Sequence, residues 1–157
     1  MRIFLDANIL FSAAKSDGAI RRLLRMLAEA GHECWVDAFV VEEANRNLLA
    51  KAIKGRAQLA ALLADVRMAP TRARDAYLES TLPLPGKDQP VLAGAIVNGC
   101  EALVTGDKAH FGRLYGKKVQ GVAIHSPRSL AEALLGGGVS KSVRQRRAKY
   151  QVRPASS

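Results

Sequence analysis

Short apolar runs along the chain alternate with longer segments in which apolar residues recur at helical spacing. The runs predict buried strands at 3–5, 33–36, 66–68, 102–105 and 119–124. The longer segments predict helices at 9–14, 19–30, 38–54, 56–64, 71–78, 90–98 and from 127 to about 135. Because strands and helices alternate, we expect an α/β fold: a single three-layer domain with a mostly parallel sheet of about five strands.

Polar residues, prolines and glycines mark the ends of several helices. Asp37 and Thr71 are each placed to cap the helix that follows, by accepting a hydrogen bond from a free amide of its first turn. Pro90 suits the first turn of a helix, where amides have no helical partner. Three glycines at 136–138 end the last helix. They divide the chain into a domain at 1–138 and a basic tail at 139–157.

The composition fits one soluble domain. The chain has 157 residues, and no stretch approaches the ~20 apolar residues that a membrane span needs. The first apolar run stops at Asp6, which is not the pattern of a signal peptide, so we expect a cytoplasmic protein without membrane contact. Cys34 and Cys100 form no CxxC motif and lie in apolar surroundings, which predicts buried free thiols.

The net charge of +10 favours a polyanionic partner. Six of the basic residues lie in 141–157, which contains no acid: Lys141, Arg144, Arg146, Arg147, Lys149 and Arg153. Such a tail is equally well explained as a solvated, disordered end and as an arm that orders on nucleic acid. Charge alone therefore leaves the role of the tail open.

Four acids fall where a parallel sheet would bring them together. Asp6 follows the first strand and Asp107 follows the strand at 102–105, while Asp88 and Glu43 lie in the first turns of helices. In a parallel sheet, strand carboxyl ends and helix amino ends face the same edge, where ligands bind. The four acids can therefore converge at one site.

Carboxylates that converge repel one another, and a bound divalent cation removes that conflict. Hard oxygen ligands suit Mg²⁺ or Mn²⁺, and the sequence has no His/Cys cluster of the kind that binds zinc. Two such ions ~3.5–4 Å apart can support phosphodiester hydrolysis. Taken singly, however, each acid has a simpler explanation, as a helix cap, a turn residue or part of a solvated helix face.

Five segments, in this order, resemble a known family. They are Phe4–Asn8, Val41–Leu48, Lys87–Ala95, Leu103–Phe111 and Val122–Pro127. Together they resemble the PIN domain family over about residues 2–135, and in particular its toxin-like branch of VapC-type ribonucleases. The resemblance implies about five parallel strands and Mg²⁺- or Mn²⁺-dependent cleavage of single-stranded or structured RNA.

The resemblance also implies roles for individual residues. Asp6 and Asp107 would hold the principal ion, and Glu43 and Asp88 would hold it through water or bind a second ion. Two polar residues, Asn8 and Thr105, would steady the acids by hydrogen bonding. Hydrolysis by water would leave 5′-phosphate and 3′-hydroxyl ends and would need no protein nucleophile. If the chain is a toxin, a protein antitoxin should cover the acidic cleft, and the fold is compatible with a homodimer.

The sequence departs from the family pattern at two points. Glu42 and Glu43 are adjacent and about 100° apart on a helix, so one of them faces the site; the Glu-Ala-x-x-Asn-Leu context favours Glu43. Some relatives have a further acid shortly after the last Asp, where this chain has Lys108, Ala109 and His110, which puts a second metal site in doubt.

Basic residues near the acids are candidates for contact with RNA phosphates. The candidates are Lys108, His110 and Arg113, with Arg72, Arg74 and Lys87 as weaker ones. For any one of the arginines and lysines, solvated surface charge is the simpler explanation. For His110, the simpler explanation is a structural histidine packed beside Phe111.

Two other functions compete with the nuclease. A haloacid-dehalogenase-like phosphatase also has an Asp after its first strand, but it needs a second Asp two residues later, where this chain has Asn8. A non-catalytic RNA- or protein-binding module on the same fold would suit the basic tail equally well. The complete set of acids argues against that module, and the sequence is silent on the target RNA.

Overall fold

The sheet has six strands in the order β3-β2-β1-β4-β6-β5 in the computed structural model, which describes residues 1–136. The strands are β1 (Arg2–Leu5), β2 (Glu33–Val36), β3 (Arg67–Met68), β4 (Ala102–Val104), β5 (Lys118–Val119) and β6 (Val122–His125). All neighbouring pairs are parallel except β5 with β6. The prediction of a mostly parallel sheet is therefore confirmed.

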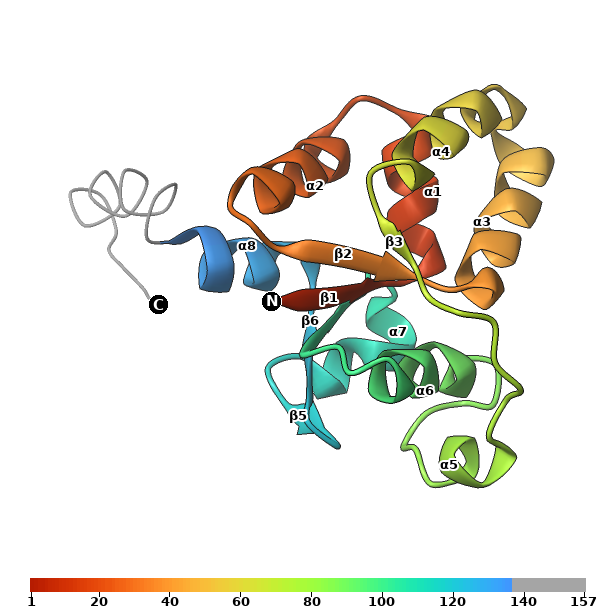
Figure 1. The fold of residues 1–157 in the computed structure, drawn as a ribbon, viewed down its shortest axis with the longest axis vertical. Coiled ribbons are helices and arrows are strands. Elements are labelled where there is room, and N and C mark those ends of the chain that lie inside the picture. Colours follow the sequence, from red (N-terminus) through yellow and green to blue (C-terminus); the bar gives the residue numbers. More distant parts are fainter. Residues whose placement is uncertain (137–157) are drawn as a thin grey trace.

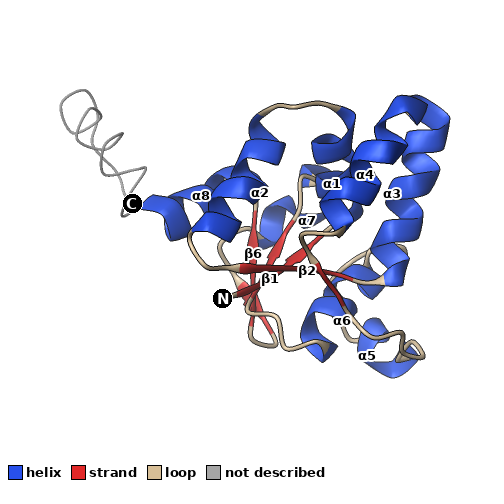
Figure 2. Cartoon of the chain, turned by 45° about the horizontal axis from the view of Figure 1, so that its top comes forward, coloured by secondary structure: helices blue, strands red, loops and turns tan. Residues whose placement is uncertain are grey.

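Helices cover both faces of this sheet, which confirms the three-layer α/β fold (Figure 1; Figure 2). The α-helices are α1 (Ala7–Lys15), α2 (Ala19–Glu29), α3 (Ala38–Lys51), α4 (Arg56–Leu63), α5 (Ala76–Ser80), α6 (Gln89–Val97), α7 (Lys108–Phe111) and α8 (Pro127–Leu135). Two short 3₁₀ helices are η1 (Ile53–Gly55) and η2 (Gly112–Leu114). In Figure 1, α1 to α4 lie on one side of β1 and β2, and α5 and α6 lie on the other.

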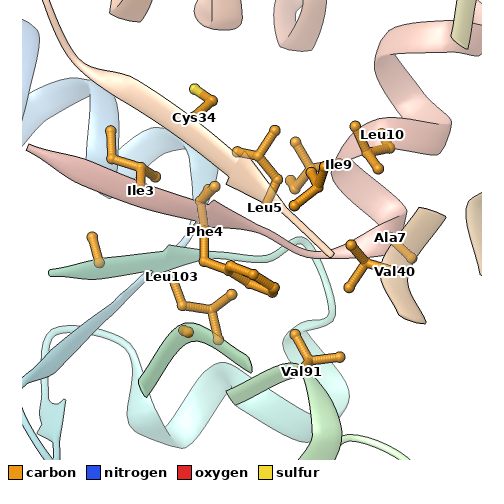
Figure 3. Close-up of a cluster of buried hydrophobic side chains, with 14 of the residues drawn as sticks. Ile3, Phe4, Leu5, Ala7, Ile9, Leu10, Cys34, Val40, Val91 and Leu103 are labelled. Atoms are coloured by element: carbon orange, nitrogen blue, oxygen red, sulfur yellow. The ribbon is translucent and has the colours of Figure 1, made fainter. Parts of the chain in front are cut away.

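Strand β1 is the centre of the core. Its side chains alternate: Ile3 and Leu5 point toward the α1 side, and Phe4 points to the opposite face with Leu103 and Val91 (Figure 3). Phe4 pairs with Leu103 in the β1–β4 register, and both are fully buried. Burial of one such side chain contributes roughly 1.5–3 kcal/mol, so this strand end is held rigidly where the chain leaves it at residue 6.

The predicted helix capped by Thr71 is wrong. Residues 71–75 form no regular structure, and α5 begins only after Asp75, whose carboxylate accepts a hydrogen bond from the Leu78 amide at 3.0 Å. Arg74 explains the difference, because its guanidinium donates two hydrogen bonds, of 2.9 and 2.6 Å, to the buried Glu79 carboxylate. This contact between two side chains five residues apart holds the segment in a conformation that propensity alone does not indicate.

The predicted strand at 119–124 is confirmed from residue 122, where β6 begins, but residues 119–121 belong to the first strand and turn of a hairpin. Gln120 and Gly121 have φ angles of 47° and 87° and form a two-residue turn between β5 and β6. Positive φ at both central residues is typical of a type I′ turn, which matches the twist of the strands it joins. The hairpin gives the sheet its sixth strand, where about five were expected.

Cys34 and Cys100 are buried and free, as predicted, and burial raises the pKa of each thiol from 9.0 to about 11. Within residues 1–136, none of the helices has the length and apolar character to cross a membrane. The predicted boundary at residue 138 and the basic segment 139–157 lie outside the described residues.

Candidate metal centre

Asp6 lies at the carboxyl end of β1 and caps α1. Its Oδ1 accepts a hydrogen bond from the Ala7 amide at 2.7 Å. Its Oδ2 accepts one from the Thr105 hydroxyl at 2.7 Å and one from the Asn8 side-chain amide at 3.2 Å. The side chain is buried, so these three donors fix the carboxylate in place.

Burial raises the pKa of Asp6 from 3.8 to about 6. The hydrogen bonds from Thr105 and Ala7 oppose this rise, and the negative charges of Glu43 and Asp88 add to it. The charged form of Asp6 is therefore destabilised in the folded chain, and a nearby cation would stabilise it.

The turn after β4 brings Thr105 and Asp107 to the same edge. Leu5 pairs with Val104 in the parallel ladder, so the two strands end side by side. The Thr105 hydroxyl, which donates to Asp6, also accepts a hydrogen bond from the Asp107 amide at 3.0 Å. Asn8 closes the turn from the other side, because its Oδ1 accepts the Gly106 amide at 2.8 Å. Thr105 and Asn8 thus make the kind of contacts that the resemblance implied.

Asp88 is at the N-cap position of α6, but its carboxylate makes no capping hydrogen bond to that helix. The residue is 8% exposed, and among the described residues its Oδ2 is a buried oxygen without a hydrogen bond. Burial raises the pKa of this carboxyl; the charge of Asp107 adds to the rise, while His110 and Lys87 oppose it. A buried carboxylate oxygen without a donor is costly unless a cation compensates it.

Asp107 caps α7 and faces Asp88 across a histidine ring. Its Oδ1 accepts a hydrogen bond from the His110 amide at 3.2 Å, and its Oδ2 lies 2.9 Å from His110 Nδ1. The same Nδ1 lies 3.0 Å from Asp88 Oδ2. One ring nitrogen carries at most one proton, so it can donate to only one of the two carboxylates. These three residues offer ligand atoms within 4.8 Å of one another, a donor set that fits a divalent cation.

Glu43 faces the other acids from α3. It is half-buried and its charge raises the pKa of Asp6, whereas Glu42 on the same helix is exposed. The compact group formed by Asp88, Asp107 and His110 does not include Asp6 or Glu43. The pairing of Asp6 with Asp107 at the principal ion, which the resemblance implies, stays a prediction.

The basic candidates are placed differently from one another. Lys108 and Lys87 are exposed, one at the start of α7 and the other next to Asp88. Arg113 is exposed as well, and its guanidinium donates to the Pro83 carbonyl. The Arg74 guanidinium is paired with the Glu79 carboxylate, so it is not free to bind an RNA phosphate.

The model of the PIN domain family matches residues 2–109. This chain belongs to the PIN domain family. Among solved structures, its PIN domain is similar to VapBC2 from Rickettsia felis bound to a promoter DNA fragment, with a TM-score of 0.61 and 17% identity over 80% of this chain and 98% of that one.

The same fold occurs in two further VapBC structures. DNA-bound VapBC from Salmonella typhimurium matches with a TM-score of 0.60 and 14% identity, over 81% of this chain and 98% of that one. VapBC-1 from nontypeable Haemophilus influenzae matches with a TM-score of 0.58 and 11% identity, over 82% and 99%. Identities this low establish a shared fold and nothing finer. No curated protein matches the sequence.

One residue of this PIN domain that supports the site carries no sequence signal. Tyr115, directly after η2, donates a hydrogen bond from its hydroxyl to the Thr105 carbonyl at 2.8 Å. Burial raises the pKa of this phenol, and the charges of Asp107 and Asp6 raise it further. Tyr115 therefore fixes the backbone of the turn that presents Asp107. An isolated tyrosine in a loop gives no periodic or spacing pattern by which to find it.

Proposed function

We propose that this PIN domain is a divalent-metal-dependent endoribonuclease of the toxin type. The observation that carries the proposal is the buried Asp88 Oδ2, which lacks a hydrogen bond among the described residues and lies beside Asp107. Acids arranged in this way are poor structural residues, because each raises the energy of the others. They are good ligands for a cation that is bound during the reaction.

The residues that would hold the ion are Asp88 and Asp107, with Asp6 and Glu43 as the further acids of the same edge. A bound Mg²⁺ or Mn²⁺ supplies activation of water and stabilisation of the charge that develops on the phosphate. Thr105 holds the Asp6 carboxylate and the Asp107 amide at once, so the two acids keep their relative position. Preorganisation of this kind is what makes charged groups effective in catalysis.

The charge of the chain favours a nucleic acid as the substrate, and we propose RNA because of the family. The net charge is +10, although the site itself is acidic. Exposed Lys87, Lys108 and Arg113 lie on the segments that flank the acids, where they can contact backbone phosphates on either side of the bond that is cut. Six further basic residues in 141–157, outside the described residues, would extend that contact.

A protein antitoxin is the partner that we propose. Three of the structural neighbours are VapBC structures, and two of these hold DNA. An antitoxin that covers the acids of this chain would block access to RNA and supply positive charge to the uncompensated carboxylates. In the competing function, a non-catalytic binding module, the acids would have no such reason to be brought together.

Cleavage of total cellular RNA by the purified full-length chain tests the proposal. The reactions contain Mg²⁺, Mn²⁺ or EDTA and use the wild type, Asp107→Asn and, as a matched control, Asp65→Asn, which changes an exposed acid of the α4–β3 loop. We expect metal-dependent cleavage with 5′-phosphate ends by the wild type and the control, and none by Asp107→Asn. Cleavage that survives both Asp107→Asn and Asp88→Asn would refute this metal centre. RNA binding without cleavage under every condition would support the binding module instead.

A further inference from the structure

We propose that His110 is a direct ligand of the divalent ion, so that the centre is a mixed nitrogen–oxygen site that favours a first-row transition-metal ion over Mg²⁺. The inference rests on the proposed function, since it concerns the same ion. It goes further by naming a ligand that is not an acid and by predicting which ions the centre prefers.

The spacing of the three ligand atoms is the first support. His110 Nδ1 lies 2.9 Å from Asp107 Oδ2 and 3.0 Å from Asp88 Oδ2. Adjacent ligands of an octahedral ion with bonds of ~2.1 Å lie ~3.0 Å from one another. The nitrogen is therefore already spaced from each of the two oxygens as neighbouring ligands of one ion are, and the three residues offer ligand atoms within 4.8 Å of one another.

The hydrogen bonds of the group are the second support. His110 Nδ1 can satisfy one carboxylate, and Asp88 Oδ2 is the buried oxygen that it leaves without a donor. A cation bound to all three atoms compensates both carboxylates and uses the nitrogen lone pair. In that state Asp88 Oδ2 has a partner, which it lacks among the described residues in the metal-free arrangement.

The position of the ring on α7 is the third support. Asp107 is the N-cap of α7 and His110 follows three residues later in that helix, which brings the two side chains to the same side. The Asp107 carboxylate accepts the His110 amide, and the adjacent Phe111 is fully buried and anchors the helix to the core. The His110 ring is thus held at the carboxylates by the backbone. A structural histidine packed beside Phe111, which the sequence allowed, does not describe this arrangement.

The donor set determines the preference among ions. Mg²⁺ is bound almost entirely by oxygen and keeps much of its water, whereas imidazole nitrogen suits first-row transition-metal ions. A nitrogen ligand should therefore raise the affinity for a transition-metal ion without raising the affinity for Mg²⁺. Mn²⁺ is the convenient probe, because it is paramagnetic.

The test uses the full-length, metal-free chain with Mn²⁺ and no RNA. Pulsed electron paramagnetic resonance detects nitrogen nuclei that are bound directly to Mn²⁺. The chain has three histidines, so replacing their ¹⁴N by ¹⁵N changes that signal only if one of them is a ligand. We expect a directly bound imidazole nitrogen in the wild type. We expect it to persist in His32→Gln, which changes a half-buried histidine at the amino end of β2, and to be lost in His110→Gln.

Affinities measured on the same samples complete the test. Loss of a residue that only hydrogen-bonds to a metal ligand commonly lowers metal affinity about 10- to 100-fold. Loss of a direct ligand should cost at least as much, so His110→Gln should weaken Mn²⁺ binding at least about tenfold. Binding of Mg²⁺ should change by less than about threefold. Tighter binding of both ions by His110→Gln would overturn the proposal and show that the ring only occupies the place of the cation.

The outcomes separate this inference from the proposed function. A histidine nitrogen on Mn²⁺ in a chain that cuts no RNA would support the ligand and refute the ribonuclease. RNA cleavage by a chain whose bound Mn²⁺ shows no histidine nitrogen would support the ribonuclease and refute His110 as a ligand. The isotope comparison is made on the wild type, so the ligand proposal can be refuted even if His110→Gln fails to fold.

Discussion

Replacement of Asp6 by asparagine should stabilise the metal-free chain near neutral pH. The pKa of Asp6 is about 6 in the folded chain against an ordinary value of 3.8. Because the folded state holds the proton more tightly than the unfolded state, ionisation of Asp6 weakens folding. That weakening is absent well below pH 3.8, grows between 3.8 and about 6, and is complete above.

The magnitude follows from the shift. A shift of two pKa units lowers the free energy of unfolding by roughly 3 kcal/mol at pH values above the folded pKa. Asparagine carries no charge, so the variant regains most of this free energy. Its side chain, however, presents an amide to the Thr105 hydroxyl and to the Asn8 amide, which costs about 1 kcal/mol. We therefore expect Asp6→Asn to be more stable than the wild type by about 1–2 kcal/mol near pH 7.

Urea unfolding in EDTA, at about pH 7 and about pH 4, measures the effect. The hydrogen-bond loss is nearly independent of pH, so the gain from Asp6→Asn should fall by about 2 kcal/mol between the two conditions. Asp65→Asn, at an exposed position, should show no comparable difference. An Asp6→Asn variant that is less stable near pH 7, or a gain that is equal at both conditions, would refute the electrostatic account of this site.

Three further substitutions test the surroundings of the acids. Glu43→Gln should lower RNA cleavage at least about tenfold, and Glu42→Gln should leave it within about twofold, because only the first faces the acids; initial rates decide this. Tyr115→Phe removes the hydrogen bond to the turn after β4 and should lower the free energy of unfolding by about 1 kcal/mol, with a loss of Mn²⁺ affinity that a purely structural effect would not produce. Gly94→Ala should destabilise the fold by about 1–3 kcal/mol in urea, because its added Cβ would lie 2.6 Å from Asp37 Oδ2; equal stability would show that α6 can shift.

The fold and the edge that carries the site could be predicted from the sequence. Apolar runs that end in Asp6 and Asp107 predict strand ends, and parallel strands bring such ends together. Which acids meet could not be predicted, because the compact group depends on α7, a helix of only four residues. One helical turn is too short for any periodic pattern, so the place of His110 between two carboxylates had no signal in the sequence.

The two other differences from the predicted elements lie in a loop and in a turn. Residues 71–75 have ordinary helical propensity but form no helix, and Arg74 in this segment is bound to the buried Glu79 carboxylate. The β5–β6 turn has Gln120 at a position where asparagine or glycine is the usual signal. In both places the sequence lacks a local mark of the structure that forms.

The placement of three aspartates at helix amino ends has a consequence for how the chain folds in the absence of an ion. Asp6, Asp88 and Asp107 occupy the N-cap positions of α1, α6 and α7. An α-helix presents roughly half a positive charge at its amino end, so α1 and α6, with 9 residues each, offset part of the repulsion among the acids. We therefore expect the chain to reach its native fold without an ion, unlike small domains whose folding depends on zinc. Metal loading would then be a separate event after folding, open to competition from an antitoxin that reaches the site first.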